Sequence, residues 1–326
     1  MNNFTYAESI REALSFLLKK DKNFHILGQG VTSPWYVGGT LLELDKIYPK
    51  RVLETPVSEN LITGVGAGAS MLGIKCLVVH PRMDFMLYAC DSIINQIAKW
   101  NYITGGSVNA PVTIRGIINR GGSQGAQHSQ SLHSIFAHFP GLRVVVPYSP
   151  KDAHDLLIAS IKCKDPVMFI EDRWLYNTKQ NFKANYNLEL KKVKPQIVLK
   201  GKDITIVGNS FSTYLAIESS KELQKKDIMP EVIDLRVLNP LNIDIIIKSV
   251  NKTKRLLVVD GGHENLGLGN SLLGSILRKI NPKKLINKPD VISLPNTPAP
   301  SSERLEKFYY PSKKKIINTI INCLKN

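Results

Sequence analysis

Short, almost continuously apolar runs alternate with segments of helical periodicity along this chain, which limits its possible folds strongly. Such runs suit strands buried on both faces, whereas one-sided strands alternate apolar and polar residues. The first half contains the runs Phe24–Leu27, Val52–Leu53, Cys76–Val79, Val112–Arg115, Arg143–Val146 and Val167–Ile170. Helices are expected between them at Tyr6–Lys19 (with Thr5 as N-cap), Asn60–Leu72, Met86–Trp100 and Lys151–Lys162. The alternation predicts an α/β fold with a parallel sheet covered on both faces.

A second α/β region follows residues 178–200, which are polar and basic and show no clear period. Its expected strands are Ile204–Val207, Glu231–Leu235, Arg255–Val259 and Val291–Leu294. Its expected helices are Thr213–Lys225, Ile243–Val250, Leu268–Ile280 and Ser312–Leu324. A length of 326 residues suits about two domains. We therefore predict two three-layer α/β domains with parallel or mixed sheets, at residues 1–177 and 201–326, joined by a linker at 178–200.

The chain is basic, with 43 Lys and Arg against 27 Asp and Glu, a net charge of +16. Residues 1–177 contribute +3 and residues 178–326 contribute +13. Lysines outnumber arginines. The planar guanidinium group of arginine binds phosphates and bases with two hydrogen bonds at once, which lysine does not do. A solvated lysine-rich surface is therefore expected rather than a nucleic-acid site. No apolar stretch reaches the length of a membrane-spanning helix, and the first residues show no signal-peptide pattern. Four scattered cysteines without metal-binding spacing add to the prediction of a cytoplasmic protein.

The sequence Glu54-Thr-Pro-Val-Ser-Glu59 follows a predicted strand and leads into a helix. Pro56 ends the strand, and Ser58 is expected to cap a helix that begins near Asn60. Glu59 would then lie in the first helical turn at the carboxyl end of a strand, where open α/β sheets place their sites. Alternatively, its negative charge could have only a structural role, which is to stabilise the positive end of the helix dipole. The glycines of residues 64–73 lie inside the helix, so they indicate close packing rather than a nucleotide-binding loop.

Two further loops follow predicted strands. His80-Pro-Arg-Met-Asp-Phe85 comes after Cys76–Val79, and a glycine-rich segment from Gly121 places His128 in a polar cluster at an expected helix start. Histidine is the usual side chain for proton transfer near neutral pH. His128, His133 and His138 are five residues apart and diverge on a helix, so a zinc site is not expected. A carboxylate, an aromatic ring and a histidine on three strand-end loops together predict an active site.

In these motifs the chain resembles the β subunit of thiamine-diphosphate-dependent 2-oxoacid dehydrogenase E1 components. The resemblance rests on ETPVSE at 54–59, Phe85 before DSIINQIAK at 91–99, and GAQHSQS at 125–131. It continues through PGLRVVVP at 140–147, DPVMFIE at 165–171, VIDLRVLNPL at 232–241 and NTPAP at 296–300, and so covers nearly the whole chain. It implies a pyrimidine-binding domain followed by a transketolase C-terminal-type domain.

The resemblance also implies roles for single residues. Glu59 matches the glutamate that hydrogen-bonds N1′ of the aminopyrimidine of thiamine diphosphate. Phe85 matches the aromatic residue that stacks on this ring, and Val57 matches the small apolar residue beside it. His128 matches the histidine that handles protons or charge on the 2-oxo acid or acyl acceptor. A K⁺ ion would be held by backbone carbonyls at the positions matching Val112, Ser160, Cys163 and Asp165.

The family's diphosphate and Mg²⁺ are held by a Gly-Asp-Gly motif, which this sequence lacks. The resemblance therefore implies an α subunit that supplies this half of the cofactor site in an α2β2 assembly. The expected reaction is decarboxylation of a small 2-oxo acid such as pyruvate, with acyl transfer to lipoyl E2. Acetoin-type cleavage or a synthase without E2, related to transketolase, is the alternative. A non-catalytic subunit with a basic binding surface is more remote.

Some positions depart from the family pattern. Gly28-Gln-Gly-Val31 stands where relatives carry acidic residues, Arg82, Met83 and Asp84 replace a more neutral run, and Tyr88 replaces a glutamine. Lys283, Lys284 and Lys288 make the segment before Asp290 basic, where relatives often dock a basic E2 domain. Because like charges repel, these lysines would disfavour the docking of a basic E2 domain, and they therefore count against lipoyl E2 as the acyl acceptor.

Overall fold

A computed structural model describes residues 3–325, which divide into two compact units. The first unit comprises residues up to Arg120 together with Ile135–Val193 and Leu238–Pro240. The second comprises Gly121–Ser134, Lys194–Val237 and the residues from Leu241 onward. None of the described helices is long and apolar enough to cross a membrane.

The first unit is built on a seven-stranded sheet with the order β12-β6-β7-β5-β4-β2-β3. The pairings of β2 with β3 and β4, of β4 with β5, and of β7 with β5 and β6 are parallel, as the apolar runs predict. The strands are β2 (Phe24–Gly28), β3 (Val52–Glu54), β4 (Lys75–His80), β5 (Thr113–Ile118), β6 (Arg143–Val145), β7 (Val167–Asp172) and β12 (Val237–Asn239). The helices are α1 (Tyr6–Lys20), α2 (Leu44–Ile47), α3 (Glu59–Met71), α4 (Trp100–Ile103), α5 (His133–His138) and α6 (Pro150–Lys162), with a 3₁₀ turn, η3, at Arg173–Leu175.

The helix expected at Met86–Trp100 is wrong as a single α-helix. A 3₁₀ helix, η1 (Met83–Ala89), is followed by a π-helical stretch, η2 (Asp91–Ile97), and then by α4. Met83, Met86 and Ala89 are all fully buried, and their three-residue spacing is that of a 3₁₀ helix. Gly116 of β5 makes room for this helix, because a Cβ atom there would lie 2.4 Å from the sulfur of Met86.

A fully buried ion pair lies in the core of the first unit. Arg115 of β5 donates through Nη2 to Glu171 of β7 at 2.9 Å and to the hydroxyl of Thr40 at 2.8 Å. The hydroxyl of Tyr176 donates to the same carboxylate at 2.8 Å. A buried charge is tolerated only when it is paired and hydrogen-bonded in this way, so an arginine can stand inside a strand of otherwise apolar character.

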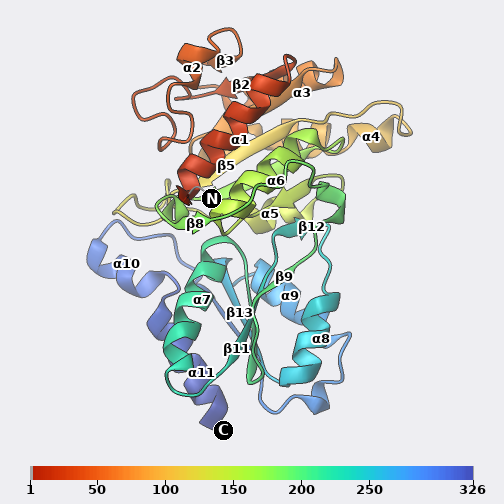
Figure 1. The fold of residues 1–326 in the computed structure, drawn as a ribbon. Helices are drawn as coiled ribbons and strands as arrows, with labels where there is room; N and C mark the ends of the chain where they lie inside the picture. Colours follow the sequence, from red (N-terminus) through yellow and green to blue (C-terminus); the bar gives the residue numbers. More distant parts are fainter. Residues whose placement is uncertain (1–2, 326) are drawn as a thin grey trace. The chain divides into compact units, whose positions relative to one another are not determined.

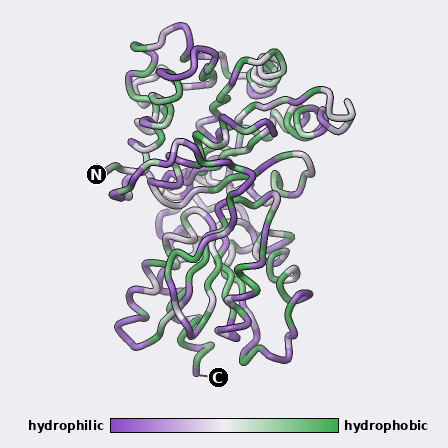
Figure 2. The backbone as a smooth tube through the Cα atoms, turned by 45° about the vertical axis from the view of Figure 1, so that its right-hand side comes forward, coloured by the Kyte–Doolittle hydropathy of each residue, from purple (hydrophilic) through white to green (hydrophobic). Residues whose placement is uncertain are grey.

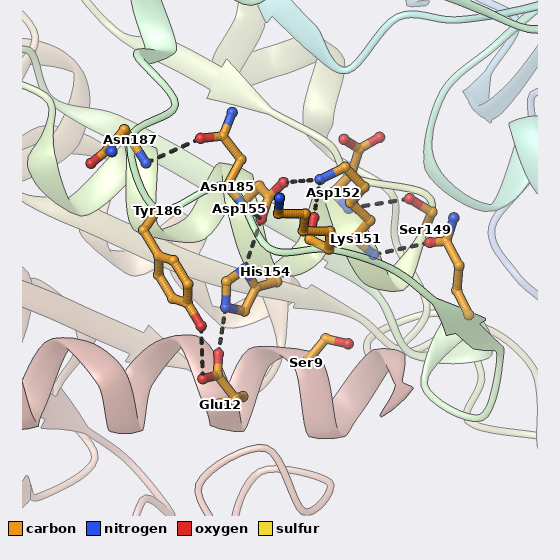
Figure 3. Close-up of polar contacts among 12 residues, drawn as sticks. Ser9, Glu12, Ser149, Lys151, Asp152, His154, Asp155, Asn185, Tyr186 and Asn187 are labelled. Carbon is orange, nitrogen blue, oxygen red and sulfur yellow. Dashed lines mark hydrogen bonds and ion pairs between the residues drawn. The ribbon is translucent and has the colours of Figure 1, made fainter. Parts of the chain in front are cut away.

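Residues 178–200 carry more structure than their lack of period suggests. β8 (Lys179–Asn181) pairs antiparallel with β1 (Asn3–Thr5), η4 forms a 3₁₀ turn at Leu190–Lys192, and β9 (Gln196–Leu199) joins the second sheet. Figure 3 shows how the residues after β8 are fastened to α1 and α6. His154 of α6 lies between the carboxylates of Glu12 and Asp155, Tyr186 donates to Glu12 at 3.3 Å, and the Asn185 amide donates to Asp155 at 2.9 Å.

The second unit is a five-stranded sheet with the order β14-β13-β10-β11-β9, in which only β9 is antiparallel to its neighbour among the described strands. Figure 1 shows α7 and α11 on one side of it and α8 and α9 on the other. The strands are β9, β10 (Ile204–Gly208), β11 (Pro230–Asp234), β13 (Leu256–His263) and β14 (Asp290–Leu294). The helices are α7 (Ser210–Gln224), α8 (Asp244–Thr253), α9 (Leu268–Leu277), η5 (Pro282–Lys284), α10 (Glu303–Tyr309) and α11 (Lys313–Lys325).

The second core forms where α7 and α11 meet the sheet. Its buried members include Leu215, Ala216 and Leu223 of α7, and Ile316 and Ile320 of α11. In Figure 2 the central strands of this unit are coloured largely hydrophobic, and its peripheral turns are hydrophilic. Each unit therefore has helices packed on a largely parallel sheet, and the predicted three-layer α/β fold class is confirmed.

Candidate active site

A cavity of about 600 Å³ opens in the first unit beyond the carboxyl ends of three neighbouring strands, β4, β2 and β3. The chain that leaves β3 brings Glu59, the chain that leaves β4 brings Phe85, and the chain that leaves β2 brings Trp35. The full lining consists of Gln29, Trp35, Val57, Ser58, Glu59, Asn60, Pro81, Arg82, Phe85 and Tyr88. Three of the residues predicted from the sequence, Val57, Glu59 and Phe85, thus meet in one cavity.

Glu59 is the first residue of α3, and only 8% of its surface is exposed. Within residues 3–325, no donor is hydrogen-bonded to its carboxylate. The amino end of a helix favours a negative charge, which makes this position tolerable for a buried carboxylate. Ser58 occupies the N-cap position, but its side chain makes no capping hydrogen bond, so that expectation is wrong. The hydrogen-bonding capacity of the Glu59 carboxylate is thus left for a ligand.

Apolar surface is exposed around this carboxylate. Val57 is 79% exposed, Tyr88 is 78% exposed and Phe85 is 36% exposed, and all three line the cavity. Exposed apolar side chains beside a few polar groups are typical of small-molecule sites. An aromatic heterocycle that carries an N–H group would satisfy the carboxylate and cover the apolar surface at once. The aminopyrimidine of thiamine diphosphate has this chemistry, so the residues fit that group.

α3 packs closely on β4, as its glycines predict. A Cβ atom on Gly66 would lie 2.3 Å from a methyl group of Val78, so only glycine allows this approach. Further along β4, His80 is buried, and its Nε2 lies 3.0 Å from the hydroxyl of Thr63 on α3. Burial lowers the pKa of His80 to about 4, so its imidazole is neutral at physiological pH. The sequence names His80 only as the first residue of a loop, and a supporting role for it is not predicted.

His128 belongs to a segment, Gly121–Ser134, that packs with the second unit. The expected helix start is displaced, since α5 begins only at His133 and His128 lies in the loop before it. The Gly121 amide donates to the hydroxyl of Tyr310 at 3.3 Å, and Nε2 of His133 lies 2.8 Å from a carboxylate oxygen of Asp260. Among the described residues, no group of three or more His, Cys, Asp or Glu is placed to hold a metal ion.

The four positions implied for K⁺ lie near one end of β5, α6 and β7. Ser160 is in the last turn of α6, Cys163 follows that helix, and the Cys163 amide donates to the Ser160 carbonyl at 3.1 Å. Val112 precedes β5, and its carbonyl accepts from Val167 of β7 at 3.0 Å. Each of these carbonyl oxygens retains a second lone pair. The carboxylate of Asp165 is paired with Arg143 at 2.7 Å.

Comparisons with known proteins agree with this geometry. Residues 2–179 match the family model "Transketolase, pyrimidine binding domain", and residues 194–316 match "Transketolase, C-terminal domain". The chain is 33% identical to the pyruvate dehydrogenase E1 component subunit beta of Rickettsia bellii, with 97% of each chain covered. It is 32% identical to the beta subunit of acetoin:2,6-dichlorophenolindophenol oxidoreductase of Bacillus subtilis, over 98% of this chain and 96% of that one.

Solved structures give the same fold. A split gene transketolase, described as an inactive beta4 tetramer, superposes with a TM-score of 0.78 over 99% of both chains at 20% sequence identity. The family matches cover both units, and the curated relatives are covered over nearly their whole length. The chain therefore belongs to the family of pyruvate and acetoin dehydrogenase E1 β subunits, which are built from the pyrimidine-binding and C-terminal domains of transketolase.

Proposed function

We propose that this chain is the catalytic β subunit of a thiamine-diphosphate-dependent 2-oxoacid dehydrogenase. The observation that supports this most directly is the nearly buried carboxylate of Glu59 in a cavity with exposed apolar walls. A purely structural carboxylate at a helix start would be expected to have a protein donor or full solvation. The Glu59 carboxylate has no such donor within residues 3–325.

Three residues of the cavity have definite tasks in this proposal. Glu59 would accept a hydrogen bond from N1′ of the aminopyrimidine, and its negative charge would favour a proton on that nitrogen. Phe85 would stack on the ring, and Val57 would provide an apolar contact beside it. When bound, thiamine diphosphate supplies a nucleophilic carbon and an electron sink for the decarboxylation of a 2-oxo acid. The protein chain contributes binding, orientation and control of one proton.

His128 is proposed to transfer or hold a proton on the substrate side. It lies in a polar loop between Gly121 and α5, and histidine changes charge near neutral pH. This role requires that His128→Ala lowers turnover more than it lowers cofactor affinity. A His128→Ala enzyme with unchanged turnover would contradict it.

An α-type subunit is proposed to complete the site in an α2β2 assembly, because the sequence contains no Gly-Asp-Gly motif for the diphosphate and Mg²⁺. We expect the isolated chain to bind thiamine diphosphate with Mg²⁺ too weakly for calorimetry at micromolar concentrations. Co-expression with a Gly-Asp-Gly-bearing partner should restore tight binding. Tight binding by the isolated chain would refute the need for the partner.

The carbonyls of Val112, Ser160, Cys163 and Asp165 are proposed to bind K⁺. Such a site would make the thermal stability of the protein depend on K⁺.

A second candidate function differs from the first in its substrate and its acyl acceptor. Pyruvate and acetoin dehydrogenase β subunits match this chain at nearly equal identity, 33% and 32%. Lys283, Lys284 and Lys288 are exposed in the second unit, and such a surface would repel a basic E2 domain. Acetoin-type cleavage without pyruvate dehydrogenase E2 is therefore the second candidate. Dye reduction by the co-expressed complex with pyruvate or acetoin, each with and without lipoyl E2, separates the two.

A cytoplasmic location is proposed from the thiols. All four cysteines are free, and structural disulfides are typical of oxidising compartments. Fractionation of cells that express the native gene tests the location directly.

A further inference from the structure

The loop that carries His128 is fastened to the second unit at three points. The Gly121 amide donates to the Tyr310 hydroxyl at 3.3 Å, and the Ser123 amide donates to both carboxylate oxygens of Glu306 at 3.2 Å. At the other end of the loop, His133 contacts Asp260 at 2.8 Å. The position of the loop is therefore set by side chains of the second unit.

Asp260 is a rigid anchor. Its carboxylate is fully buried and accepts hydrogen bonds from Asn209 Nδ2 at 3.2 Å, the Gly262 amide at 3.3 Å and the Gly269 amide at 3.2 Å. Burial alone would raise the pKa of this carboxyl group, but the His133 imidazole and the other donors outweigh burial and lower it. An ionised carboxylate held by this many donors has little freedom to move.

The imidazole of His133 makes a contact through each of its two nitrogens and also packs against the backbone. Its Nε2 faces Asp260, its Nδ1 lies 2.9 Å from the hydroxyl oxygen of Ser131, and only 1% of its surface is exposed. A Cβ atom on Gly262 would come within 3.2 Å of the imidazole Cε1, so the ring lies tightly against the backbone of β13. Ser129, Ser131 and Leu132 are buried as well. The chain between His128 and α5 is thus held by its neighbours at nearly every position.

We propose that His133 is a positioning residue for His128, and that its hydrogen bond to Asp260 fixes the loop that presents His128 to the substrate. The inference rests on the proposed catalytic role of His128. His133 itself is too deeply buried to touch a substrate, although Ser131, His133 and Asp260 form a hydroxyl–imidazole–carboxylate series. Precise placement of an acid–base group matters because small displacements reduce turnover strongly.

The test uses the complex co-expressed with the α-type partner, with pyruvate- and acetoin-dependent dye reduction as the assay. His133→Ala removes the donor to Asp260, whereas His133→Gln keeps a donor near the position of Nε2. Gly262→Ala keeps both partners and crowds the ring. His138→Ala is the matched control, since His138 is exposed at the far end of the same short helix.

We expect His133→Ala to lower kcat at least tenfold with less than a threefold change in KM, and His133→Gln to recover most of the loss. Gly262→Ala should lower kcat to an intermediate value, and His138→Ala should stay within twofold of wild type. A double mutant of His128→Ala with His133→Ala should be no slower than His128→Ala alone, because a positioning residue has nothing left to position. Additive losses in the double mutant, or a His133→Ala kcat within twofold of wild type, would overturn the proposal.

Hydrogen exchange of the isolated chain gives a readout without turnover. His133→Ala should speed amide exchange in residues 121–132 at least tenfold and leave β11 and β14 unchanged. Unchanged exchange in the loop would overturn the positioning role. A fully active His128→Ala enzyme would instead overturn the proposed role of His128, and the exchange result would still decide whether His133 holds the loop.

Discussion

The hydroxyl oxygen of Thr63 lies 3.0 Å from Nε2 of His80, and this contact joins α3 to the end of β4. Thr63 is one helical turn after Glu59, and His80 is the residue before Pro81 of the cavity lining. The helix that carries Glu59 and the strand that precedes the Phe85 segment are therefore tied together by a buried polar pair. Among the residues that the structure describes, Nδ1 of His80 has no hydrogen-bond partner, so none of them offers an acceptor for a second ring proton.

The first prediction concerns this imidazole. Because the pKa of His80 is lowered to about 4 in the folded chain, the folded state binds fewer protons than the unfolded state between pH 6.5 and 4. Stability is therefore full above pH 6.5 and falls as the pH falls, by about 2 kcal/mol at pH 5 relative to pH 7. Urea unfolding of wild type and His80→Leu should show a flatter pH dependence for the variant, whatever its absolute stability. Equal slopes for the two proteins would contradict the assignment.

The second prediction concerns the contacts of Figure 3. Burial lowers the pKa of His154, but its hydrogen bonds with Asp155 and Glu12 outweigh burial and raise it. The stabilisation from this pair is full below the unfolded pKa of about 6.5 and is lost as the pH rises through the folded pKa. Glu12→Gln should therefore destabilise the chain more at pH 6 than at pH 9 in urea unfolding. Glu43→Gln, which breaks the exposed pair with Lys46, is the control and should change the stability little, and by the same amount at both pH values.

The third prediction separates cofactor binding from folding. Phe85 lines the cavity and Leu87 does not, although both lie in η1 and are similarly exposed, at 36% and 41%. Phe85→Ala should raise the Kd of thiamine diphosphate for the co-expressed complex about tenfold, since an aromatic stack contributes about 1 kcal/mol beyond its buried area. Leu87→Ala should leave that Kd within twofold of wild type. An equal effect of both variants in calorimetry would argue against stacking on Phe85.

Much of the fold is readable from the sequence, because buried parallel strands leave unbroken apolar runs. Val167–Ile170 and Cys76–Val79 lie within β7 and β4. The α-helix expected at Met86–Trp100 is wrong because an apolar spacing of three or four does not separate 3₁₀, α and π geometry over two turns. The start of α5 is also misplaced, because the polar cluster around His128 resembles a helix cap. Its loop is held instead by distant partners such as Asp260 and Glu306.

The candidate site also contains some residues that the sequence predicts and others that it does not. Val57, Glu59 and Phe85 follow strand ends, and parallel strands of neighbouring position bring such ends to one edge. The contributions of Trp35, Arg82 and Tyr88 to the cavity lining depend on side-chain directions in loops with no periodic pattern. The pairing of His133 with Asp260 spans 127 positions of the chain, and no local signal in the sequence indicates it.

The central claim is that the Glu59 carboxylate serves the cofactor rather than the fold. Glu59→Gln replaces it with a group of the same size that has no charge to hold a proton on N1′. In the co-expressed complex, we predict at least a hundredfold lower kcat for 2-oxo acid-dependent dye reduction, with urea stability equal to or above that of wild type. The stability follows because the variant removes a charge on a residue that is only 8% exposed and has no protein donor within residues 3–325. A Glu59→Gln complex with turnover within twofold of wild type would contradict the account.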